Sequence, residues 1–448
     1  MTNARAESPS GNAGFAGRAL LGVALVSAAA VRCGLIFSLG SHHTEAGAYE
    51  HAEIAGHLAR GEGFALRFYG EEAQPTGHQA PAVPWILSLC YRAWGMDTPQ
   101  ARAGFLLFNV ALGMVGVAAM YGIGSMMWNR RVGIWAAFGT ALYPPLAYTA
   151  TRIQAVNWSV AWMLVTLGCV MAARRRWSVG WGVCAGLAGG VALLGEPVLS
   201  GAFALVWLAV FVAAMRERPR RWAAPLAICL FTGLVVGPWV LRNAAVHGRF
   251  VPIKSAFWYS LWQGNHLEGT GTDKLLPDEQ VRRKLAWSWG FGRLEGDLAR
   301  ARAQADSVDT LLADEDRREI RRRGSEIEKM DWFRDRALRT IAEHPGHYLR
   351  MCGRRLWQMA WFDPTNPRSY VLPYRLCYLA LLLLAATGML VSVRHRPRLW
   401  HLPVLVAVGL LAVHALVITS ARFRLPLEAL LVLPAAVVPA RIGSGRTR

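Results

Sequence analysis

The sequence has little charge and few cysteines for its length. Only 17% of its 448 residues are charged, whereas a soluble protein carries roughly 25%. Its seven cysteines are scattered, without the CxxC or Cys/His spacing that is typical of metal binding. The strict alternation of a membrane β-barrel is also missing. Together with a hydrophobic content of 54%, these absences indicate a polytopic α-helical membrane protein.

Apolar runs of about 20 residues, the length that crosses a bilayer, recur along the chain. The predicted fold class is therefore all-α, a polytopic membrane bundle of about ten spans with external surface helices. The spans are expected near residues 17–39, 103–127, 132–147, 154–173, 178–195, 198–215, 222–241, 371–393, 400–419 and 425–440.

The net charge of +20 is concentrated in short loops between the spans. With a cytoplasmic N-terminus, every arginine cluster falls on the inner side, as the positive-inside rule requires. No nucleic-acid motif accompanies these arginines, so no nucleic-acid partner is expected. The predicted location is the plasma (inner) membrane, with the first loop external or periplasmic. The clusters lie at residues 130–131, 174–176, 216–221, 394–398 and 441–448.

Five parts of the chain follow from this topology. Within the external segment, the charge run at 277–340 is typical of a solvated helical hairpin, and residues 348–362 of an interfacial amphipathic helix. Arg32, near the outer end of the first span, is expected to snorkel to the interface. The parts are a disordered N-terminus (1–16), a membrane core (17–241) holding the first external loop (40–102), an external helical segment (242–370), C-terminal spans (371–440) and a cytoplasmic tail (441–448).

The first external loop holds many ionisable groups beside a span. Glu45 lies in the first turn of a predicted helix that ends at Gly61. There the helix dipole stabilises a carboxylate, which could accept a proton from a hydroxyl or merely cap the helix. Tyr49 is one turn from Glu45 and from Glu53, so the three could form a hydrogen-bonded cluster, whereas Glu50 is expected to face water.

Histidines in the same loop raise the question of a metal. His51 and His57 are six residues apart and would not share a helix face, as metal ligands on a helix usually do. His42 and His43 beside Glu45 could, although loop histidines are more often solvated. No metal site is assigned, and a divalent metal remains the open alternative.

Basic groups at the outer ends of spans run against the positive-inside bias. Arg242, Arg422 and Arg424, together with Lys254, lie at such ends. A lipid-linked phosphate would explain them, and so would contact with lipid headgroups. His78, just before a helix that starts near a proline, could bind a sugar or phosphate there or form an ordinary loop junction.

Four motifs follow one another in register along nearly the whole chain. They are Val31-Arg32-Cys33; Glu45, Tyr49, Ile54-Ala55, Leu58, Gly61 and Gly63-Phe64, followed by Pro81 to Pro84; Pro238-Trp239, Arg242-Asn243, Gly248, Phe250, Pro252, Gly264-Asn265 and Gly269; and Arg422 to Pro426. Their order resembles the C-type glycosyltransferases. The likeness is greatest to the branch that holds protein O-mannosyltransferases and the lipid A aminoarabinose transferase.

The resemblance implies a membrane glycosyltransferase. Such an enzyme moves a sugar from a polyprenyl-phosphate donor to a hydroxyl of a lipid, glycan or protein acceptor on the outer face of the membrane, with inversion. It implies Glu45 as the general base and Arg242, Arg422 and Arg424 as the groups that hold the leaving phosphate. Asn265, in the third motif, is expected to bind substrate.

The chain departs from the family pattern at its acids. The family's first acid is usually Asp and is here Glu45, and a second acid is replaced by Gln154. Glu196 stands where the family often has Arg, and it could have taken the role that Gln154 lost. These departures leave a catalytically silent relative, or a binding or assembly protein for lipid-linked sugars, as the alternative. A transporter is disfavoured because the spans hold few ionisable residues.

Overall fold

A computed structural model describes residues 10–39, 49–217, 221–286, 306–392, 397 and 399–442, with side chains from residues 17 and 50 onward in the first two ranges. These residues are mostly helical. Two short strands, β1 (Ala65–Leu66) and β2 (Gln74–Pro75), pair antiparallel with Ala65 opposite Pro75. The predicted all-α class is confirmed.

Seven stretches of the described residues are long and apolar enough to cross a membrane. Two shorter apolar helices, α9 (Val179–Gly195) and α19 (His401–Leu416), and the 13-residue α6 (Arg130–Leu142) complete the ten predicted segments. A multi-pass membrane bundle is thus confirmed, although ten is an approximate span count. The seven are α1 (Ser10–Leu39, apolar from Gly17), α5 (Pro99–Met127), α8 (Val156–Arg176), α10 (Leu199–Glu217), α11 (Ala223–His247), α18 (Leu372–Ser392) and the run of η5 (Ala421–Arg424), α20 (Leu425–Ala435) and α21 (Val437–Ile442).

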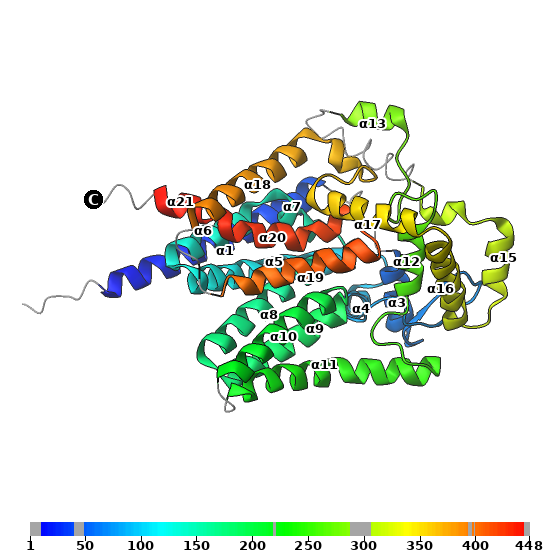
Figure 1. Cartoon of the computed structure of the whole chain (residues 1–448), viewed down its shortest axis with the longest axis horizontal. Helices are drawn as coiled ribbons and strands as arrows, with labels where there is room; N and C mark the ends of the chain where they lie inside the picture. The colour runs from blue at the N-terminus through cyan, green and yellow to red at the C-terminus, as the bar shows by residue number, and fades with distance from the viewer. Residues whose placement is uncertain are drawn as a thin grey trace, which may run out of the picture.

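The remaining elements connect the spans. In Figure 1, α3, α12, α15 and α16 gather at one end of the bundle, which we name the loop end, while α1 begins and α21 ends at the opposite end. The connecting elements are α3 (Tyr49–Arg60), α4 (Ala82–Trp94), α7 (Pro144–Tyr148), η1 (Thr149–Thr151), α12 (Phe257–Asn265), α13 (Glu279–Leu285), η3 (Val308–Leu311), α15 (Asp314–Arg322), α16 (Glu326–Glu343), α17 (Pro345–Ala360) and η4 (Pro367–Tyr370).

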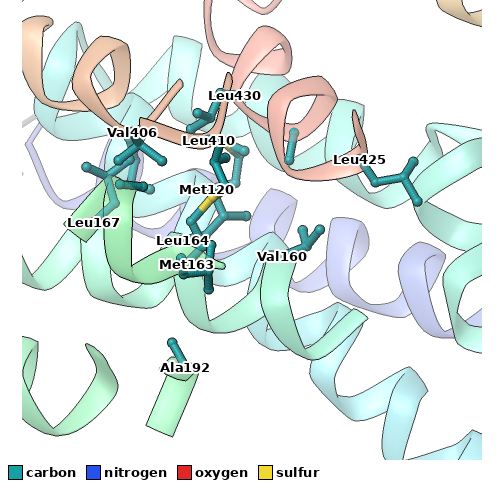
Figure 2. Packing of buried hydrophobic residues seen from close by; sticks show 14 of the residues in the cluster. Met120, Val160, Met163, Leu164, Leu167, Ala192, Val406, Leu410, Leu425 and Leu430 are labelled. Atoms are coloured by element: carbon teal, nitrogen blue, oxygen red, sulfur yellow. The ribbon is translucent and has the colours of Figure 1, made fainter. Parts of the chain in front are cut away.

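One large apolar cluster forms the centre of the bundle, and smaller clusters lie beside it. Figure 2 shows Met120 of α5, Leu164 of α8, Leu410 of α19 and Leu430 of α20 meeting in the large cluster. Small residues set how closely the helices approach, as is usual for membrane helices. A Cβ added at Gly186 of α9 would lie 2.6 Å from a backbone oxygen of α11. Since similar close approaches recur at four-residue spacing along this face, α9 and α11 pack backbone to backbone.

Arg32 does not snorkel, so that prediction is wrong. Its side chain is 2% exposed, and its Nη1 donates to the carbonyl oxygen of Ala141 at 3.0 Å. The last carbonyls of α6 lack partners within their helix and carry its negative dipole end, so they attract a guanidinium. Gly113 of α5 leaves the space that the arginine occupies.

The charge run of the external segment is only partly solvated. Helix α13 carries exposed charges, and residues 287–305 lie outside the described residues. Helix α16, in contrast, buries Trp332 and Phe333 in a cluster with Trp262 of α12. In α17, Arg355 is fully buried while Trp357 is exposed, so its arginines do not all face water. The solvated hairpin was therefore a wrong prediction for α16.

Candidate functional site

The first candidate, Glu45, lies outside the described residues, as do His42 and His43. The described helix α3 begins at Tyr49, of which only the backbone is described. The described residues that bear on this site surround the start of α3. The first of them, Glu50, is half-buried and does not simply face water as expected.

Six ionisable side chains from five segments come together at the loop end, and we name them the polar cluster. They lie at the start of α3, in the loop before α4, at the C-cap of α9, in the loop before α12 and in η5. Mutual electrostatic effects on the groups that titrate show their proximity. The six are Glu50, His51, His78, Glu196, Lys254 and Arg422.

Lys254 lies at the centre of the charges in this cluster. Burial lowers the pKa of its ammonium group, the carboxylates of Glu196 and Glu50 raise it, and Arg422 lowers it. Within the described part of the chain, neither Lys254 nor Arg422 forms an ion pair with a carboxylate. Two cations that influence each other without such a partner create a site that favours an anion.

Two histidines of the cluster have unused ring nitrogens. His78 is 2% exposed, and its ring centroid lies 4.5 Å from that of Phe68 and 5.7 Å from that of Tyr259. Burial lowers the pKa of His78 and lowers the pKa of His51 to about 4. The Nδ1 atoms of both are buried without a hydrogen-bond partner among the described residues. Neutral imidazoles of this kind can donate to or accept from hydroxyl groups.

Arg242 is largely occupied by contacts within the protein. Its Nη1 donates to the carbonyl oxygen of Thr76 and its Nη2 to that of Phe64, at 2.5 and 3.1 Å. The guanidinium also lies 4.9 Å from the ring centroid of Trp239. This arginine therefore ties α11 to the two outer ends of the β1–β2 hairpin, just before His78.

The two arginines of the last motif have different surroundings. Arg424 is 2% exposed, and its Nε lies 2.6 Å from Oε1 of the fully buried Glu428. The hydroxyl of Tyr143 donates to the other oxygen of Glu428 at 2.8 Å, so this carboxylate has two partners. Arg422 is exposed and belongs to the polar cluster. A 3₁₀-helix has three residues per turn, and η5 points these two side chains in different directions.

Like Arg424, most of the other predicted site residues have partners within the protein and do not belong to the polar cluster. Glu53 accepts from the Nε and the backbone N–H of Arg67, at 2.8 and 3.0 Å. Asn265 is 1% exposed and accepts from Nη1 of Arg355 at 3.1 Å. Gln154 is half-buried in the bend before α8. The structure therefore brings together His78, Glu196 and Arg422 and engages Glu53, Arg242, Asn265 and Arg424 within the fold.

The described residues do not fit a metal site. Within described ranges, no group of three or more His, Cys, Asp or Glu side chains is arranged to hold an ion. The histidines for which a metal was considered, His42 and His43, are not among them.

No protein-family model matches the sequence, and neither does any curated protein. Solved structures do match, and they define the class of this molecule: a membrane bundle with the C-type glycosyltransferase fold. The oligosaccharyltransferase of Archaeoglobus fulgidus in its apo form matches with a TM-score of 0.55 and 14% identity, over 96% of this chain and 51% of that chain. The oligosaccharyltransferase AglB from Archaeoglobus fulgidus, solved with an inhibitory peptide and a dolichol-phosphate, matches with a TM-score of 0.54 and 13% identity, over 96% of this chain and 51% of that chain.

ArnT from Cupriavidus metallidurans, bound to undecaprenyl phosphate, matches with 15% identity over 98% of this chain and 79% of that chain. Its TM-score of 0.40 is too low to support an argument. At the identity of the oligosaccharyltransferase matches, the similarity establishes the fold alone. This chain also spans only about half the length of those oligosaccharyltransferase chains.

Proposed function

We propose that this chain is a glycosyltransferase that moves a sugar from a polyprenyl-phosphate donor to an acceptor hydroxyl at the loop end of the bundle. The acceptor is a lipid, glycan or protein, and the loop end faces the outer side of the plasma membrane. The observation that carries the proposal is the pair of cations Lys254 and Arg422, which lack an ion-pair partner among described residues. AglB, which shares the fold, has been solved with a dolichol-phosphate.

The reaction is a single displacement. The acceptor oxygen attacks the anomeric carbon, the bond from that carbon to the phosphate oxygen breaks, and the phosphate leaves with the electron pair. Lys254 and Arg422 hold the growing negative charge, which is where fixed cations contribute most. One displacement inverts the anomeric configuration.

In this proposal a carboxylate accepts the proton of the acceptor hydroxyl. Glu45 is the candidate that the family resemblance supplies. Glu50, five residues further along the sequence, is the described acid of α3 in the polar cluster. Glu196 lies close enough to raise the pKa of Lys254, so in this proposal it keeps the ammonium charged. His51 and His78 bind hydroxyl groups of the sugar.

The proposal is tested with undecaprenyl phosphate as the binding probe and purified full-length protein. Replacing Lys254 or Arg422 by Met is expected to weaken binding about 10- to 100-fold, because a hydrogen bond to a charged group contributes about 1.5–3 kcal/mol. Arg339→Met, at an exposed arginine of α16, is the matched control and should bind as wild type. Wild-type affinity in both cluster variants would contradict the proposal.

A second measurement separates an enzyme from a silent relative. Cells that lack the gene should accumulate one polyprenyl-phosphate sugar, and the wild-type gene should remove it. If Glu45→Ala and Glu50→Gln both remove that lipid as well as wild type does, these acids do not act as the base. If no carrier sugar accumulates while the protein still binds the probe, the alternative of a binding or assembly protein is favoured.

A further inference from the structure

One buried carboxylate joins two loops that lie far apart in the sequence. Glu326, the first residue of α16, is 5% exposed. It accepts hydrogen bonds from the hydroxyl of Thr76, from the backbone N–H of Gly77 at 3.0 Å and from the hydroxyl of Ser255 at 2.5 Å. The backbone N–H of Ser255 also donates to the carbonyl oxygen of Gly77 at 2.8 Å. The loop before α4 and the loop before α12 therefore meet at this carboxylate.

A second residue of α16 contacts the same part of the chain at an earlier point, between β1 and β2. Lys329, three residues after Glu326 and 4% exposed, donates from Nζ to the carbonyl oxygen of Phe68 at 2.8 Å. The ring of Phe68 lies against His78. Residues three apart on a helix lie on the same face. One face of α16 therefore holds the segment from Phe68 to Gly77 at both of its ends.

The position of Glu326 allows its charge to be buried. It lies in the first turn of α16, whose N-terminus Ser325 and Glu328 close with a capping box. The helix dipole favours a negative charge there, and three donors satisfy the carboxylate. Removal of the side chain would leave the donors of Thr76, Gly77 and Ser255 buried without an acceptor.

We propose that Glu326 is the positioning residue of the polar cluster and fixes His78 relative to Lys254. His78 follows Thr76 by two residues, and Lys254 directly precedes Ser255. Glu326 does not touch the substrate but sets where these two side chains stand. The inference depends on the proposed function only in taking Lys254 as a ligand of the donor phosphate. In this inference the external segment fixes the positions of His78 and Lys254, which the membrane helices alone would not fix.

The test measures hydrogen–deuterium exchange of the full-length protein and its affinity for undecaprenyl phosphate. In Glu326→Ala, exchange should rise at least about tenfold in peptides covering residues 74–79 and 251–256, because the donors there lose their acceptor. Affinity should fall about tenfold, and Glu326→Gln, which keeps one acceptor oxygen, should recover part of both effects. Asp335→Ala removes an exposed carboxylate from the same helix and should change neither.

A double variant tests whether Glu326 acts through Lys254. If it does, Lys254→Met combined with Glu326→Ala should bind no more weakly than Lys254→Met alone, since coupled sites are not additive. If the losses of binding free energy in the two single variants add in the double variant, Glu326 does not act through Lys254. Should Glu326→Ala fail to fold, Ser255→Ala and Thr76→Val each remove one donor and should loosen the same two peptides.

We name the contacts of Glu326 with Thr76, Gly77 and Ser255 the clamp. The outcomes for the clamp and for the proposed function are distinguishable. Wild-type protection and affinity in Glu326→Ala would overturn the clamp and leave the proposed function standing. A wild-type protein that does not bind undecaprenyl phosphate would overturn the proposed function, while faster exchange in both loops of Glu326→Ala would still support the clamp.

Discussion

The buried pair of Arg424 and Glu428 allows a sharp prediction about stability. Both side chains are at most 2% exposed, and their charged atoms are 2.6 Å apart. The hydroxyl of Tyr143 donates to Glu428 at 2.8 Å, and Nη2 of Arg424 donates to the hydroxyl of Tyr374 at 2.9 Å. The network joins α20 to α18 and to the connection between α6 and α7.

The cost of breaking this pair follows from the charge that is left behind. Glu428→Gln should destabilise the protein by about 3 kcal/mol, and Arg424→Met by about 3–5 kcal/mol, because each leaves a buried group without its counter-charge. The double variant Arg424→Met/Glu428→Met should lie within about 1 kcal/mol of wild type, since buried ion pairs can often be replaced by apolar groups. Additive losses would instead predict about 6 kcal/mol or more.

The assay is thermal unfolding in detergent, followed by tryptophan fluorescence. Arg422→Met is the control because Arg422 is exposed and lacks an ion pair within the described residues, so its melting temperature should stay at the wild-type value. A wild-type melting temperature for Glu428→Gln, or a double variant less stable than either single one, would refute the reasoning. In that case Arg424 would again be a candidate for binding the donor phosphate.

Two further predictions concern a close approach and a charge. A Cβ at Gly264 would overlap the carbonyl oxygen of Val417, so Gly264→Ala should lower the melting temperature clearly; Gly233→Ala, with no atom within 4 Å, should leave it unchanged or raise it slightly. Glu196→Gln removes the largest influence that raises the pKa of Lys254, so affinity for undecaprenyl phosphate should be lost at a lower pH than in wild type as the pH rises. Superimposable pH profiles would count against this role of Glu196.

The membrane spans could be predicted because their length is set by the bilayer and not by contacts between helices. The sequence also showed the position of Arg32 within its span, but it did not show whether the side chain points to the membrane surface or into the bundle. That direction depends on the C-terminal carbonyls of α6 and on Gly113 of α5, which are about 80 to 110 residues away. A hydropathy profile contains no information about such partners.

One signal in the sequence was available and was missed. Glu428 follows Arg424 by four residues, the spacing at which opposite charges meet on a helix. No acid stands four residues after Arg422, so the two arginines of the motif could have been distinguished before the structure was known. The polar cluster, in contrast, joins α3, the loop before α4, the end of α9, the loop before α12 and η5. The hydrogen-bond partners of Glu326 are 71 and 250 residues away in the sequence. No local pattern predicts contacts of that range.

The charged groups of the described residues differ in whether the fold supplies them with a partner, and this difference is the strongest argument for the site. Arg32, Arg355, Arg424 and Glu326 are each matched by helix carbonyls, a carboxylate or a set of donors, as groups removed from water must be. Lys254 is half-buried and near Arg422, and neither has an ion-pair partner among the described residues. The fold gives these four buried groups protein partners, but it gives Lys254 and Arg422 no carboxylate partner within the described residues. A phosphate bound at Lys254 and Arg422 would supply the missing negative charge.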